Sequence, residues 1–139
     1  MTAPAVHLPY LPLAGIPGSL MPRLPLTLRL RERSAAVVGL LDTGSAINFL
    51  PYAVGVALGA VWEQQTMPVP LAGSLGQTEA CALIVDAEHP QLTQIHPARL
   101  VFAWTKAEEV PIIFGQVNFF LAFDVCFYRA EAAFEIRPR

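Results

Sequence analysis

An aspartate directly after an apolar run is the feature of this sequence that most constrains its fold. The run 35–41 holds only alanine, valine, glycine and leucine, and it ends in Asp42-Thr43-Gly44-Ser45. Continuous apolar runs of this length are typical of strands buried on both faces. An isolated buried charge is costly unless it is paired, neutralised or used. The pattern therefore predicts a buried strand that delivers one aspartate into a glycine turn, and the motif occurs only once.

The remaining patterns are mostly those of strands. Leucines alternate with other residues over 24–30, which predicts a strand that forms a hairpin with 35–41 through a polar turn at 31–34. Pro51 begins and Gly59 ends a predicted helix over 52–58, because proline suits the first helical turn. We expect further strands at 46–50, 61–69, 81–85, 100–104 and 110–114, a short helix at 116–121, and a final hairpin at 125–136. The expected fold class is mainly β, with one or two short helices.

The N-terminal segment differs from the rest of the chain because it is rich in proline. Six prolines occur within residues 1–25, and proline excludes both a helix and a central strand. We therefore expect an extended arm over 1–23, followed by one domain over 24–139. The sequence leaves open whether this arm is an inhibitory segment, a tether or part of an interface.

Composition limits the possible partners. The 139 residues are enough for one core, and 54% are hydrophobic while only 14% are charged. Such a chain favours a homo-oligomer that covers an apolar face. The net charge of −2 predicts no nucleic-acid partner.

No signal peptide is evident in the sequence. The uncharged stretch 43–61 is interpreted as a strand and a helix rather than a membrane span, so we expect a cytoplasmic protein.

The cysteines and histidines give no sign of a metal site. Cys81 and Cys126 are too few for a disulfide framework and lack ligand spacing, so we expect buried free thiols. His7, His89 and His96 are scattered along the chain, without the paired spacing of metal ligands. We therefore expect no metal and no cofactor.

The motif and its context resemble a known family. Leu40-Leu41-Asp42-Thr43-Gly44-Ser45 is similar to the active-site motif of aspartic proteases, and the short chain resembles their retropepsin-like branch of retroviral, cellular and bacterial enzymes. An apolar segment, 46–50, follows the motif, and Ile112-Ile113-Phe114-Gly115 resembles the second conserved element of that family. The resemblance covers about residues 24–136. It implies a retropepsin-like acid-protease barrel that acts as a homodimer on polypeptides.

The resemblance also implies roles for the motif residues. Aspartic proteases use two carboxylates that share one proton to activate water, and this chain has one suitable aspartate, since Asp86 and Asp124 are not followed by Thr-Gly. A catalytic pair would therefore combine Asp42 from two chains. Thr43 is implied to reach across the interface, Gly44 to permit the turn, and the Ser45 hydroxyl to donate to the Asp42 carboxylate and favour an acidic optimum. Ala46, Ile113, Phe114 and Gly115 are implied to lie beside the site.

A glycine-rich segment between these two elements is a candidate flap. Retropepsins close such a hairpin over the substrate, and Ala72-Gly73-Ser74-Leu75-Gly76 occupies the corresponding position. The same residues are also compatible with an ordinary hairpin turn.

Two departures from the retroviral pattern keep alternatives open. Ala46 and Gln116 replace an aspartate and an arginine that pair in retroviral enzymes, so no orphaned charge remains but a substrate-binding carboxylate is missing. The first hypothesis is an aspartic endopeptidase. The second is a catalytically weak or inactive peptide-binding or dimerisation module with the same fold, and the third is an unrelated fold in which the motif is accidental.

Overall fold

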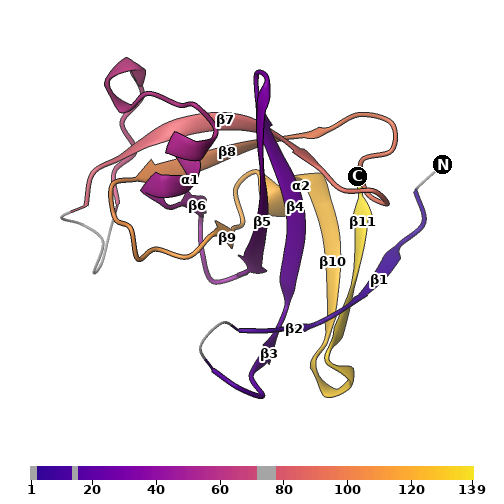
Figure 1. The fold of residues 1–139 in the computed structure, drawn as a ribbon. Helices are drawn as coiled ribbons and strands as arrows, with labels where there is room; N and C mark the ends of the chain where they lie inside the picture. Colours follow the sequence, from indigo (N-terminus) through magenta and orange to yellow (C-terminus); the bar gives the residue numbers. More distant parts are fainter. Residues whose placement is uncertain (1–2, 14–15, 72–77) are drawn as a thin grey trace.

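A closed barrel of six strands forms the body of the protein (Figure 1). The structure is a computed structural model that describes residues 3–13, 16–71 and 78–139. Neighbouring strands follow the order β4-β5-β9-β6-β8-β7 around the barrel. Their bounds are β4 Arg23–Leu30, β5 Arg33–Leu41, β6 Asn48–Leu50, β7 Ala80–Glu88, β8 Ala98–Thr105 and β9 Ile113–Phe114. The predicted fold class, mainly β, is confirmed.

Strands β4 and β5 form the predicted hairpin. Leu26 pairs with Val37 in an antiparallel register, and Arg31, with a φ of 54°, lies in the turn. Burial alternates along both strands, as expected where one face packs on a core. Because Ala36 is exposed while Val37 is buried, the prediction that β5 is buried on both faces is wrong for its first half.

The short strand β9 lies between β5 and β6, although β5 and β6 are consecutive in the chain. Leu41 of β5 pairs with Phe114 in a parallel register, and Phe49 of β6 pairs with Ile113 in an antiparallel one. A Cβ atom at Gly39 would lie 2.4 Å from the Phe114 ring, so glycine allows this close packing. The loop that joins β5 to β6 must therefore pass around the end of β9.

The two ends of the chain form a second sheet beside the barrel (Figure 1). Its strand order is β1-β11-β10, with β1 Val6–Pro9, β10 Phe123–Tyr128 and β11 Ala133–Pro138. The proline-rich arm thus contributes an edge strand, with Leu8 opposite Phe134, and not a central one. A two-stranded ribbon, β2 Leu11–Pro12 with β3 Leu20–Met21, connects this sheet to β4.

Four short helical segments complete the described part of the chain. They are α1 Tyr52–Ala57, α2 Phe119–Ala122 and the 3₁₀ turns Trp62–Gln64 and Arg129–Glu131. The predicted helix after Pro51 is confirmed, and Gly59 follows it with a φ of 83°. The strand predicted over 61–69 is wrong, because one 3₁₀ turn and a single bridge from Pro68 to Cys81 occupy that segment.

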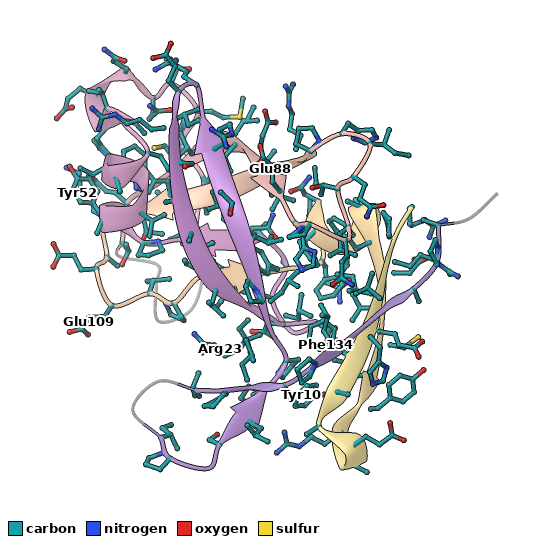
Figure 2. The ribbon with its side chains drawn as sticks, turned by 45° about the vertical axis from the view of Figure 1, so that its right-hand side comes forward. Tyr10, Arg23, Tyr52, Glu88, Glu109 and Phe134 are labelled. Atoms are coloured by element: carbon teal, nitrogen blue, oxygen red, sulfur yellow. The ribbon has the colours of Figure 1, made fainter. Side chains whose placement is uncertain are left out.

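Aromatic side chains join the barrel to the second sheet. The Phe119 ring stacks on Phe114 of β9 at 4.7 Å between centroids and lies 4.9 Å from Phe123 of β10. Tyr10 lies against Phe134, with 6.3 Å between the ring centroids, and Figure 2 labels the two residues close to each other beside the second sheet. Apolar burial on both sides of α2 therefore fixes the second sheet to the end of β9.

The two cysteines lie in different environments. Cys81 in β7 is buried, as predicted, but Cys126 in β10 is exposed, so the prediction of two buried thiols is wrong for Cys126. Burial raises the pKa of the Cys81 thiol.

Among the described helices, none has the length and apolar character needed to cross a membrane.

Candidate active site

Asp42 begins a tight turn at the end of β5. Its backbone N–H donates to the carbonyl oxygen of Phe114 at 3.0 Å, which continues the β5–β9 pairing by one residue. Its carbonyl oxygen accepts from the N–H of Ser45 at 3.1 Å, and its carboxylate oxygen Oδ1 accepts from the N–H of Gly44 at 2.9 Å. Asp42 is half-buried. The carboxylate is therefore bonded within its own turn, at a residue that is partly open to solvent.

The turn is attached to the segment that follows β9. The backbone N–H of Gln116 donates to the carbonyl oxygen of Ser45 at 2.9 Å, and that of Val117 donates to the carbonyl oxygen of Ala46 at 2.8 Å. The side-chain Nε2 of Gln116 donates to the carbonyl oxygen of Thr43 at 2.8 Å. The structure thus brings the predicted motif 42–46 together with the predicted second element.

Gly115 permits this close approach. A Cβ atom at this position would lie 2.3 Å from the carbonyl oxygen of Ile47 and 2.7 Å from its carbonyl carbon. Backbone cannot yield as the end of a flexible side chain can, so a side chain here would push the two segments apart. Ile113 and Phe114, which precede this glycine, pair with β6 and β5 respectively. The close approach therefore gives a structural reason for glycine at position 115, and strand pairing places Ile113 and Phe114 beside it.

A buried amide network behind the turn was missed by the sequence predictions. Asn48 is 0% exposed, and its Oδ1 accepts the N–H of Gly115 at 2.7 Å. Its Nδ2 donates to the carbonyl oxygen of Val101 and to Oδ1 of Asn118, at 3.0 and 2.9 Å. Asn118, with a φ of 82°, also accepts the N–H of Val101 and donates to the carbonyl oxygen of Arg99. These two asparagines join β6, β8 and the start of α2.

The role expected for Ser45 is not supported by its geometry. Its hydroxyl donates to the carbonyl oxygen of Ile47 at 2.7 Å. A hydroxyl carries one proton, so in this arrangement it does not donate to Asp42. The serine instead stabilises the second half of the loop. Thr43 is exposed, and its side chain is available to a neighbouring molecule.

The other two aspartates lie in ion pairs. Asp86 of β7 is 3.8 Å from Arg99, and Asp124 of β10 lies 3.3 Å from both Arg137 and Arg139. These pairs are partly exposed, so they contribute little to stability individually. They nevertheless distinguish Asp42, whose carboxylate is bonded by a backbone N–H in a turn, from two aspartates with arginine partners.

The candidate flap, Ala72-Gly73-Ser74-Leu75-Gly76, lies outside the described residues. On either side of it, Leu71 and Thr78 line a pocket of about 640 Å³. Its wall is largely apolar and includes Trp62, Val69 and the buried Cys81. The prediction of a flap remains a prediction.

Neither metal-ligand geometry nor similarity to known proteins identifies a function for this turn. Within residues 3–13, 16–71 and 78–139, no group of three or more His, Cys, Asp or Glu side chains could hold a metal ion. No protein-family model matches the chain, and no curated protein matches it either.

Proposed function

We propose that the chain is an aspartic endopeptidase, with a catalytic pair built from Asp42 of two copies. One observation carries the proposal: Asp42 is half-buried, and the Gly44 N–H holds its carboxylate in a turn that is bonded to β9 and to the residues after it. Catalytic side chains need this kind of fixed orientation, because small displacements cost large factors in rate. The resemblance to retropepsin-like enzymes supports the same chemistry.

The proposed mechanism needs no covalent intermediate. Two carboxylates placed close together cannot both ionise, so the pair holds one proton. The ionised carboxylate takes a proton from water, and the water oxygen attacks the peptide carbonyl carbon. The protonated carboxyl donates to the carbonyl oxygen, and a proton then passes to the leaving nitrogen as the C–N bond breaks.

The homodimer in this proposal would form around the turn. Thr43 and Ala46 are exposed in the loop, and Val117, whose N–H bonds to Ala46, is 58% exposed. Leu121, in the following helix α2, is 71% exposed. Apolar side chains concentrated beside a functional loop favour an interface. The terminal strands β1, β10 and β11 already pair within one chain, so their mutual pairing does not have to be exchanged between copies.

A non-catalytic binding or dimerisation module is the second candidate. The observation that favours it is the bond from the Gly44 N–H to Asp42, because an aspartate that caps its own turn has a structural use without any reaction. This module would retain the same turn and the same dimer. The two candidates differ only in whether water is activated.

The test compares the wild-type chain with Asp42→Asn. Both are assayed from pH 3 to 8 on an unfolded protein with hydrophobic residues along its length, and both are sized in solution. The endopeptidase predicts a dimer that cleaves under acidic conditions, and an Asp42→Asn dimer without cleavage. Asp86→Asn is the matched control, since it removes a carboxylate distant in sequence and paired with Arg99, and it should retain cleavage. A dimer that never cleaves would favour the second candidate, and a monomer would exclude a shared pair.

A further inference from the structure

We propose that Gln116 is a positioning residue for Asp42, which acts by fixing the peptide group between Thr43 and Gly44. The catalytic consequence rests on the proposed function, whereas the positioning itself does not. Gln116 is exposed, and the sequence singles it out only as a residue that stands where retroviral enzymes have an arginine. Its importance follows from two hydrogen bonds that meet on one peptide group.

The two bonds hold opposite ends of that peptide group. Its carbonyl oxygen, from Thr43, accepts from Nε2 of Gln116 at 2.8 Å. Its N–H, from Gly44, donates to Oδ1 of Asp42 at 2.9 Å. A trans peptide is planar, so its C=O and N–H point in opposite directions and rotate together. Fixing the carbonyl oxygen therefore fixes the direction of the N–H that reaches the carboxylate.

The base of the Gln116 side chain is held as firmly as its tip. The backbone N–H of Gln116 bonds to the carbonyl oxygen of Ser45, and the next residue, Val117, bonds to that of Ala46. On the other side, Gly115 is buried against the backbone of Ile47. The amide thus starts from a fixed point and spans the loop from Ser45 back to Thr43.

Loss of the Gln116 donor would free the peptide group to rotate. Thr43 and Gly44 are both exposed, and glycine has the widest range of accessible backbone angles. A rotated peptide would turn its carbonyl oxygen towards the carboxylate, where two acceptors repel. A hydrogen bond at the carbonyl oxygen also polarises the group and strengthens the N–H as a donor. Gln116 therefore keeps the carboxylate oriented and supplied with a donor.

The test measures the Gly44 amide directly by NMR on the full-length chain. Gln116→Met has nearly the same shape without the donor, and Gln116→Arg places an N–H the same number of bonds from Cα. Gln94→Met is the control, since it makes the same glutamine-to-methionine change at an exposed position of a different loop and does not touch this bond. We expect proton exchange at Gly44 to become roughly 2–10-fold faster in Gln116→Met, because a net hydrogen bond of about 1 kcal/mol is lost. Gln116→Arg should restore slow exchange, and Gln94→Met should leave exchange at Gly44 unchanged.

A kinetic measurement adds the catalytic consequence. On a peptide substrate, Gln116→Met should lower kcat with little change in KM, and Gln116→Arg should recover it. Unchanged Gly44 exchange in Gln116→Met, or no recovery in Gln116→Arg, would overturn the positioning role. If the wild-type chain cleaves nothing, the proposed function fails, yet Gly44 exchange still decides whether Gln116 positions the turn.

Discussion

Gly115 donates its backbone N–H to the side-chain Oδ1 of Asn48 at 2.7 Å, although 67 positions separate the two residues. Asn48 begins β6, and Gly115 follows β9, so this bond joins the far end of the Asp42 loop to the second element of the site. The bond is buried, and Asn48 uses both of its amide protons as well. A fully satisfied buried network of this kind favours one arrangement of the loop over others.

Replacing Asn48 with leucine is expected to destabilise the fold strongly. The variant would leave the buried Gly115 N–H without its acceptor and would remove a donor from the carbonyl oxygen of Val101 and from Oδ1 of Asn118, which costs about 2–4 kcal/mol in the free energy of unfolding. Urea unfolding followed by circular dichroism measures this change. Gln94→Leu, at an exposed position of a surface loop, is the control and should change stability by less than about 0.5 kcal/mol. Equal effects of the two variants would show that the network is not needed.

Gly115→Ala is expected to disturb the site and not only the stability. The added Cβ would meet the Ile47 backbone at 2.3 Å, so the loop and the segment after β9 must separate. Overpacking of this kind costs about 1–3 kcal/mol. Gly18→Ala is the control for a loss of stability without a clash. Gly18 has a φ of 75°, so alanine strains the backbone there, but open space surrounds the added Cβ. NMR shifts at residues 42–47 should move in Gly115→Ala alone; undisturbed shifts there would contradict the close approach.

Much of the fold could be predicted because local patterns determine it. The alternating leucines of β4 and the apolar run of β5 contain their own strand signal, and Pro51 marks the start of α1. The segment 61–69 was predicted wrongly, because its apolar residues lack the length or regular alternation that separates a strand from a 3₁₀ turn.

The site could be predicted only in part. The motif at Asp42 and the second glycine at 115 are visible in the sequence, and the structure brings them together. Asn48 and Asn118 were missed, because a single asparagine in an apolar segment gives no local signal of the distant backbone groups that it bonds. Gln116 was noted as the absence of an arginine, while its contact with Thr43 depends on tertiary structure.

His89 should make the fold sensitive to mild acid. Burial lowers the pKa of His89 from the ordinary value of 6.5, and its Nδ1 accepts the N–H of Gln91 at 3.1 Å. Below pH 6.5 the unfolded chain binds a proton that folded His89 resists, so this contribution to stability is complete above pH 6.5 and is lost as the pH falls through the lowered pKa.

Thermal unfolding of His89→Asn between pH 7.5 and 5 tests this dependence. An asparagine oxygen can replace the Nδ1 acceptor without titrating in this range, so Tm should fall less with acid than in the wild-type chain. His96→Gln, at an exposed position of the same loop, is the matched control and should keep the wild-type slope. Parallel slopes for wild type and His89→Asn would show that His89 does not carry the effect.

The two cysteines should react at different rates. Cys126 is exposed in β10, whereas Cys81 is buried and its thiol pKa is raised by burial. Since the thiolate is the reactive form, iodoacetamide at pH 8 should modify Cys126 at least about tenfold faster than Cys81, as followed by mass spectrometry. The Cys126→Ser variant should stay unmodified until denaturant is added, and rapid labelling of that folded variant would contradict the packing of β7.

The central claim, a catalytic pair shared by two chains, is tested most directly by mixing wild-type protein with Asp42→Asn. The chains are exchanged to equilibrium, and cleavage is measured as the wild-type fraction is lowered at constant total protein. If each pair needs Asp42 from both chains, activity should fall with the square of the wild-type fraction. Activity that falls only in proportion to that fraction would mean that each chain holds a complete site, and the shared Asp42 pair would be wrong.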